Sequence, residues 1–276
     1  MKLKKIYRFD NKRQIWRIIP TANGKLIIEE REPEKKQAYF HCLELESGKK
    51  ILNDFQLDDK FWVGVETVQD DIIYFHKFAK PDMPKHRGIF AFDSRSKNFI
   101  WENPELIFQF IFKEKLYTFI EKFEGRDYYA INPFNGEILE EMGNNYQLIN
   151  TLRNESTIEE NNHGYLFPEI FKIDTGNSQI TEFIESLRKN FVVSGKIEHI
   201  LKNGLLFFSF HEVNSKGNLN NLFKTVDLST GKYILEEVIN KEASLYLTDS
   251  FFIKDDFLFL LFGKTRLQVY KIIIKS

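Results

Sequence analysis

The chain has 276 residues, a formal net charge of −1 at pH 7 and a hydrophobic content of 42%, which together indicate a globular protein and exclude a disordered one. Its balanced charge lacks the basic excess of nucleic-acid binders, and no apolar run approaches the roughly 20 residues of a membrane span, so we expect neither kind of partner. The basic start is not followed by the apolar segment of a secretory signal, and a single cysteine, Cys42, agrees with a reducing compartment. We therefore expect a cytoplasmic location.

Strand-forming residues dominate the chain, with 28 Phe, 11 Tyr and many Ile and Leu. Short apolar runs bounded by Gly, Asp and Asn predict strands. In chain order these runs include residues 61–68, 71–78, 88–92, 106–111, 115–121, 127–131, 205–210 and 257–262.

Helical spacing is confined to one segment, residues 180–190, so we expect at most one short helix. Its apolar stripe consists of Ile180, Phe183, Ile184 and Leu187. Two other segments, residues 153–163 and 212–220, have the polar composition of solvated loops.

A repeated turn frame organises the whole chain. It consists of an acidic or amide residue, a short turn and usually a glycine, followed by a predicted strand; Lys97 replaces the glycine in one copy. The first side chain can bond its own backbone to start the turn, and glycine accepts the positive φ that closes it. The frame begins at Asp10, Glu44, Asp93, Asn132, Asp174 and Asp227, at intervals of about 43 residues.

One hairpin per interval of this length is typical of a four-stranded propeller blade. The sequence therefore predicts an all-β fold, a single β-propeller domain over residues 1–276 with six blades of strands A to D, where strand D follows the turn. The last blade would combine residues 245–274 with the N-terminal strand around residues 6–16, which closes the ring and removes a free edge. Seven blades are the alternative.

The segment from Ala91 through Asp93 to Trp101 resembles the tryptophan-docking repeat of the quinoprotein-like (PQQ-repeat type) β-propeller superfamily. In that repeat a small residue lets a tryptophan of strand D lie across the junction between blades, and Trp16 and Trp101 hold the tryptophan place here. The chain is also similar to uncharacterised bacterial members of the superfamily. It has no adjacent cysteine pair and fewer predicted blades than the quinoprotein enzymes, so the resemblance implies the fold without the cofactor.

The chemistry-bearing residues form no recognised catalytic or metal-binding motif. The six histidines do not occur in HxH or HExxH spacing, and GxSxG, GxGxxG and P-loop patterns do not occur. We expect no cofactor and no metal from the spacing alone, although ligands distant in the sequence can assemble in the folded chain.

The loops between strands B and C are the predicted functional surface, because in a propeller they share one face with the D-to-A loops around the central channel. The segment from His76 to Gly88 stands out, since it carries two of the seven prolines and several charged residues. Charged groups of this kind suit an anionic ligand or an acidic loop of a partner. The candidate contact residues are Glu30, Arg31, His76, Asp82, His86, Arg87 and Arg126. The structural alternative is that Glu29 or Glu30 pairs with an arginine of a neighbouring blade.

The expected function is a non-catalytic scaffold that binds a protein partner or a small anionic ligand on the B–C face. The alternative is a cytoplasmic hydrolase or lyase with its site at the channel mouth. The sequence names neither a specific partner nor a substrate, and it assigns no catalytic residue.

Overall fold

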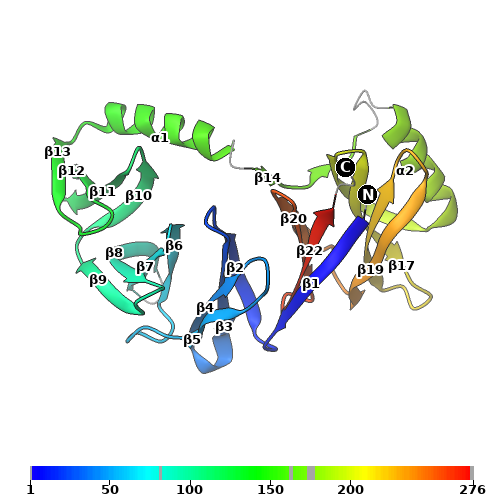
Figure 1. Cartoon of the computed structure of the whole chain (residues 1–276), viewed down its shortest axis with the longest axis horizontal. Helices are drawn as coiled ribbons and strands as arrows, with labels where there is room; N and C mark the ends of the chain where they lie inside the picture. The colour runs from blue at the N-terminus through cyan, green and yellow to red at the C-terminus, as the bar shows by residue number, and fades with distance from the viewer. Residues whose placement is uncertain (1, 81–82, 162–163, 173–177, 274–276) are drawn as a thin grey trace. The chain divides into compact units, whose positions relative to one another are not determined.

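Residues 2–80, 83–161, 164–172 and 178–273 are described by the computed structural model (Figure 1). They form two compact units, a three-sheet unit (residues 13–163) and a two-sheet unit (residues 1–12 and 164–276). The expected all-β class is confirmed, because the described strands build five antiparallel sheets.

The three-sheet unit consists of four-stranded meanders in the orders β2-β3-β4-β5, β6-β7-β8-β9 and β10-β11-β12-β13 (Figure 1). Each meander has the expected order A to D. The strands are β2 (Gln14–Pro20), β3 (Lys25–Glu32), β4 (Gln37–Glu44), β5 (Lys50–Phe55), β6 (Val63–Gln69), β7 (Ile72–Lys80), β8 (Met83–Asp93), β9 (Asn98–Asn103), β10 (Ile107–Phe112), β11 (Lys115–Lys122), β12 (Gly125–Ile131) and β13 (Ile138–Gly143), with a short 3-10 helix η1 (Pro33–Lys35) before β4.

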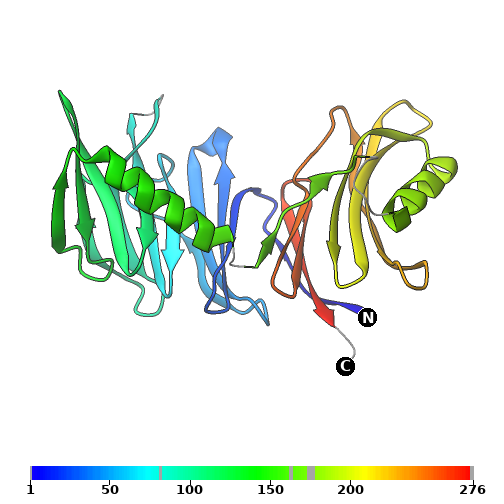
Figure 2. The same cartoon turned by 90° about the horizontal axis from the view of Figure 1, so that it is seen from above.

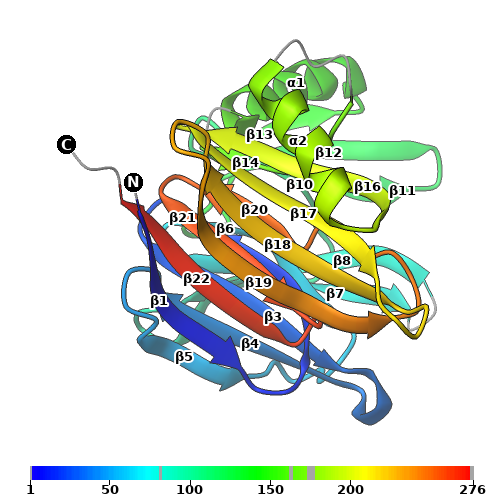
Figure 3. The same ribbon diagram turned by 90° about the vertical axis from the view of Figure 1, so that its right-hand side faces the viewer.

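The two-sheet unit contains the remaining two sheets, in the orders β15-β16-β17-β18-β19 and β1-β22-β21-β20-β14. Strand β1 pairs antiparallel with β22, so the N-terminal strand joins C-terminal strands as expected (Figure 3). The strands are β1 (Lys2–Asp10), β14 (Tyr165–Leu166), β15 (Glu169–Ile170), β16 (Val193–Lys202), β17 (Leu205–Val213), β18 (Leu219–Asp227), β19 (Lys232–Ala243), β20 (Phe251–Lys254), β21 (Phe257–Phe262) and β22 (Arg266–Ile273).

The predicted turn frame is confirmed as a hairpin between the last two strands of four sheets. The residue in the glycine position has a positive φ in every one of these copies, including Lys97 at 59°. The frame that begins at Asp174 lies outside the described residues. The closing bonds are Gly48 N to Glu44 O at 2.8 Å, Lys97 N to Asp93 O at 2.8 Å, Gly136 N to Asn132 O at 2.9 Å and Gly231 N to Asp227 O at 2.8 Å.

The frame at Asp10 was predicted wrongly. It lies between β1 and β2, which belong to different sheets, so it connects sheets and does not close a hairpin. Trp16 consequently lies in the first strand of its sheet and is 59% exposed, so it does not hold the docking position that the sequence assigned to it.

Trp101 does dock as the resemblance implies. It pairs with Ala91 across β8 and β9, and its indole Nε1 donates a hydrogen bond of 2.8 Å to the carbonyl oxygen of Pro133 in the turn of the next sheet. Gly136 lies directly under the ring. Trp101 is half-buried, and its hydrogen bond joins two neighbouring sheets.

Two α-helices occur among the described residues, where the sequence predicted at most one. Helix α2 (Ser178–Asn190) confirms the expected helix, with Ile184 and Leu187 buried. Helix α1 (Tyr146–Asn161) replaces the solvated loop predicted at 153–163, of which residues 162–163 lie outside the described residues. The backbone amide of Leu148, in its first turn, donates a hydrogen bond to Oδ1 of Asn145. Its apolar face is narrow, so the mainly polar sequence of this segment did not indicate a helix.

The cores lie between stacked sheets, and each helix covers a sheet face. Residues of β3, β4, β7 and β8 form one core, and residues of β7, β8, β11 and β12 form the next. Helix α1 packs on the opposite face of the β10–β13 sheet, and α2 packs on one face of the β15–β19 sheet (Figures 2 and 3).

Between the end of β13 and residue 172, where another blade was predicted, the described elements are helix α1 and the two-residue strands β14 and β15. The described residues thus form five sheets, and the prediction of six blades is not confirmed. Neither helix of the described chain is long and apolar enough to cross a membrane.

Candidate functional site

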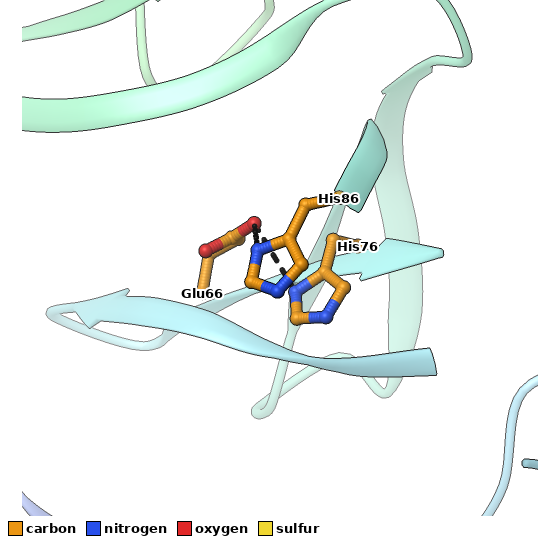
Figure 4. Close-up of side chains that lie close together, drawn as sticks. All are labelled: Glu66, His76 and His86. Atoms are coloured by element: carbon orange, nitrogen blue, oxygen red, sulfur yellow. Dashed lines mark hydrogen bonds and ion pairs between the residues drawn. The ribbon is translucent and has the colours of Figure 1, made fainter. Parts of the chain in front are cut away.

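Glu66, His76 and His86 come together on three adjacent strands of one sheet (Figure 4). The Nδ1 atoms of His86 and His76 lie 2.7 Å and 3.1 Å from the same carboxylate oxygen, Oε1 of Glu66. The two imidazole rings stack with their centroids 3.6 Å apart and their planes 9° from parallel. Two predicted candidates, His76 and His86, thus share one acidic partner.

Two irregularities in strand pairing place these side chains on one face of the sheet. The β6–β7 register shifts between Val65 and Thr67, and the β7–β8 register shifts between Phe75 and Lys77. Glu66 is therefore the extra residue of a bulge in β6, and His76 faces a second bulge, whose extra residue lies on β8 between Arg87 and Phe90. Bulges commonly redirect side chains near functional sites.

Gly64 makes room for the His76 ring. It lies opposite His76 in the β6–β7 pair, and a Cβ atom there would sit 2.8 Å from Cε1 of the imidazole. The ring of Phe78 stands nearly perpendicular to both imidazoles, at 86° in each case, with centroid distances of 5.1 Å from His76 and 5.4 Å from His86. The small residue and the aromatic wall together fix where the imidazoles can lie.

Burial and mutual contact set the ionisation of the cluster. Burial alone would raise the pKa of Glu66, but the contacts with His76 and His86 outweigh burial and lower that pKa to about 2. Burial lowers the pKa of His76, because its charged form is poorly solvated. At neutral pH the cluster therefore holds an ionised carboxylate beside a neutral, 2%-exposed His76.

Arg31 lies beside this cluster and joins two sheets. Its Nε donates to Oε1 of Glu29 at 2.8 Å, and its Nη1 donates to the carbonyl oxygen of Phe61 at 2.7 Å. Its Nη2 donates to the carbonyl oxygen of Val63 in β6. Glu29 in turn accepts the amide of Val65 at 3.3 Å. The expected alternative, a pair between Glu29 or Glu30 and an arginine of a neighbouring blade, is not what forms: Arg31 and Glu29 belong to the same strand, and each bonds backbone groups of the next sheet or of the segment before it.

Glu30 is fully buried within the β2–β5 sheet. Its Oε2 lies 2.9 Å from Nε2 of His41, and Arg13 pairs with both Glu30 and Asp54. The alternating direction of side chains along β3 puts Glu30 on the opposite side of the strand from Glu29 and Arg31. Glu30 therefore does not join the Glu66 cluster.

Arg126 lies at the start of β12, whereas Arg87 lies within β8, where it pairs with Lys77; both side chains are about half exposed. Arg87 donates to Glu105 at 2.8 Å, and Arg126 pairs with Glu121 at 3.9 Å. Glu121 also pairs with Lys85 at the start of the neighbouring sheet's β8. These residues form a charged surface on two adjacent sheets.

The structure places the predicted contact residues in three settings. His76 and His86 form one cluster, Arg87 and Arg126 belong to the charged surface of two adjacent sheets, and Glu30 and Arg31 are buried in ion pairs. Asp82 lies outside the described residues.

The segment from His76 to Gly88 is mostly strand, and not the long loop of the prediction, because β7 runs to Lys80 and β8 begins at Met83. Glu66 was missed by the sequence analysis. Only the bulge at its position brings it to His76, and no local pattern marks that bulge.

Comparisons with known proteins relate the chain to one family model and to several solved structures. A family model described as a domain of unknown function (DUF4905) matches residues 19–101, and no curated protein matches. Among solved structures, quinohemoprotein alcohol dehydrogenase from Comamonas testosteroni is 12% identical with a TM-score of 0.33, over 96% of this chain and 44% of that one. A europium-containing methanol dehydrogenase is 9% identical with a TM-score of 0.32, over 95% of this chain and 52% of that one.

An uncharacterised protein from Listeria monocytogenes EGD-e is 10% identical with a TM-score of 0.34, over 96% of this chain and 97% of that one. The chain thus spans about half the length of the two dehydrogenases.

Proposed function

We propose that this protein is a non-catalytic, β-propeller-like scaffold that binds a protein partner through the B–C strand ends of the sheets β6–β9 and β10–β13. The docking surface is defined by Lys85, Arg87, Glu121, Phe123 and Arg126. Arg87 and Arg126 are two of the predicted contact residues, and Lys85, Glu121 and Phe123 belong to the same two sheets or to their connections.

The observation that carries the proposal is Phe123. This phenylalanine sits in the connection between β11 and β12 and is fully exposed. A large aromatic side chain at the tip of a loop loses favourable burial free energy unless something covers it. Aromatic residues and arginine are also the residue types enriched at protein interfaces and at their energetic hot spots.

The surroundings of Phe123 favour a protein partner over a small anion. Lys85 and Arg126 both pair with Glu121, and Arg87 pairs with Glu105, so each of these cations already has a carboxylate partner. A small anion would have to displace a carboxylate to bind here. A protein surface can instead cover the aromatic ring and exchange charged partners at its rim.

The buried acids of the first sheet support a non-catalytic role. Glu29 is held by Arg31 and the Val65 amide, and Glu30 lies against His41. These carboxylates are occupied by contacts that hold strands together, which leaves them unsuited to proton transfer with a substrate.

The propeller itself is part of this proposal. The repeated four-strand meander, the four confirmed turn frames and the β1–β22 pairing support it. The six-bladed closed ring, the seven-bladed alternative and the cytoplasmic location stay predictions of the sequence.

Site-specific photo-crosslinking tests the docking surface. A photoreactive residue at Phe123 is expected to crosslink one defined protein in native extract. The matched control carries the photoreactive residue at Ser47, which is exposed in the turn between β4 and β5, on a different sheet from Phe123. The double variant Phe123→Ser, Arg126→Glu should lose that partner while melting at the wild-type temperature. Capture of the same partner from Ser47, or by the folded double variant, would contradict the proposal.

A further inference from the structure

We propose that Glu66, His76 and His86 form a binding site for one divalent transition-metal ion of the Zn²⁺ type. This inference does not depend on the docking surface, because it concerns a cluster inside the β6–β9 sheet. Two imidazole nitrogens and one carboxylate oxygen are a donor set that zinc and related ions use in proteins.

The three donor atoms converge closely enough to share an ion. One ligand atom from each of the three residues lies within 4.8 Å of the other two, and Glu66 Oε1 is 2.7 Å from Nδ1 of His86 and 3.1 Å from Nδ1 of His76. Donors around a tetrahedral zinc ion, at about 2.0–2.2 Å from the metal, are roughly 3.3–3.5 Å apart. The carboxylate therefore needs to withdraw by less than about 1 Å from its present contacts to admit the ion.

The two ring nitrogens of the buried His76 side chain lack hydrogen-bond partners among the described residues. Its ring is nearly fully buried, yet neither Nδ1 nor Nε2 has a well-aligned hydrogen bond to any described residue. The Nδ1 atom lies 3.1 Å from Glu66 Oε1 but out of line for a hydrogen bond. Buried polar atoms without partners are rare in folded proteins, and a coordinated ion would satisfy Nδ1.

The local backbone is built around this convergence. One bulge in β6 contains Glu66, a second bulge in β8 lies opposite His76, and Gly64 leaves space for the His76 ring. A core histidine in a regular strand requires neither feature. Bulges and a glycine together indicate that the placement of these side chains is specific.

The charge and exposure of the cluster suit a cation. Glu66 and Glu29 contribute two negative charges near His76 and Arg31 contributes one positive charge, so one negative charge is left when the imidazoles are neutral. The His86 side chain is 35% exposed, so an ion can reach the donors from that side.

Binding requires two small changes in the imidazoles. The stacked rings must tilt apart so that both Nδ1 lone pairs point at one ion, since the ring planes are now only 9° from parallel. Each neutral ring must also carry its proton on Nε2, because the metal takes the Nδ1 lone pair. The three donors leave at least one coordination position for water, as in open zinc sites.

Zinc titration of the chelator-treated full chain tests the proposal by isothermal calorimetry, with Co²⁺ absorption as a second readout. We expect one ion per chain and a rise in melting temperature with added Zn²⁺. His86→Asn and Glu66→Gln should each weaken binding at least tenfold. The matched control His199→Asn removes an imidazole from the other unit, where His199 bonds the Glu169 carbonyl, and should leave zinc affinity unchanged.

His86→Asn decides the outcome if Glu66→Gln does not fold, because His86 is the most exposed member of the cluster. Absence of one-to-one binding by the folded wild-type chain would overturn the proposal. Equal zinc affinity of wild type and folded His86→Asn would overturn it as well.

Discussion

The indole of Trp101 lies on Gly136 so closely that a Cβ atom on that glycine would sit 2.9 Å from the ring carbon Cδ2. The glycine belongs to the turn of the next sheet, whose Pro133 carbonyl accepts the indole hydrogen bond at 2.8 Å. Tyr74 donates to the same carbonyl at 3.0 Å. One turn therefore receives two aromatic side chains from the neighbouring sheet, and the glycine supplies both the turn conformation and the space.

Removing this contact should destabilise the three-sheet unit. Trp101→Ala is expected to lower the free energy of unfolding by about 3 kcal/mol, at the low end for an aromatic truncation because the ring is half-buried. Gly136→Ala should also destabilise, since its φ is +74° and its new methyl group meets the indole. Urea unfolding of both single variants and the double variant measures the coupling. Strictly additive losses would show that the two residues do not act together.

Lys97→Gly should stabilise the protein. Lys97 takes the glycine position of its turn with φ at +59°, a left-handed conformation that is unfavourable for a residue with a side chain. Glycine removes that cost, and we expect a gain of roughly 0.5–1 kcal/mol in the free energy of unfolding. The reverse change at an equivalent turn, Gly48→Ala, is the control and should destabilise. A loss of stability in Lys97→Gly, measured by urea unfolding, would contradict this explanation.

The hairpin turns could be predicted because their chemistry is local. Asp93 accepts a hydrogen bond from the Arg95 amide at 2.9 Å, and Asn132 accepts one from the Phe134 amide at 2.8 Å. Donor and acceptor are two residues apart, so a few residues of sequence are enough to predict the turn. The docking of Trp101 was predictable for a related reason, because the repeat places it opposite Ala91.

The Glu66 cluster and α1 could not be predicted in this way. Glu66 reaches His76 only because of a bulge, and a regular hairpin register would have put it elsewhere. Helix α1 presents only a narrow apolar face, with Ile149 buried against its sheet and Ser156 donating to the Ile111 carbonyl at 3.3 Å. Both features depend on tertiary packing, which a single sequence does not display.

Deleting residues 1–10 should strongly destabilise the two-sheet unit. The deletion removes β1, exposes the edge of β22 and removes the buried side chain of Phe9. Phe9→Ala is a milder version and should cost about 3–5 kcal/mol. Lys4→Ala, at an exposed position of the same strand, is the control. Thermal melting monitored by circular dichroism measures all three, and an unchanged transition after the deletion would show that β1 contributes nothing to the fold.

His211 should make the two-sheet unit less stable in mild acid. Its Nε2 accepts the Leu247 amide at 3.0 Å, and the Tyr246 ring packs against it edge-on at 5.3 Å. Burial lowers the pKa of His211 in the folded protein. Below the ordinary histidine pKa of about 6.5, His211 is therefore protonated in the unfolded chain but stays neutral in the folded one. The free energy of unfolding contributed by this residue therefore decreases as the pH falls through about 6.5.

The comparison between wild type and His211→Gln isolates this effect. Glutamine cannot be protonated in this range, so the variant should be less stable than wild type at pH 7.5 but lose less stability between pH 7.5 and 5.5. Hydrogen exchange of the Leu247 amide gives a local measurement of the same equilibrium, because that amide is the donor to Nε2. Equal pH dependence of the Leu247 exchange in wild type and variant would show that His211 does not sense pH in the folded protein.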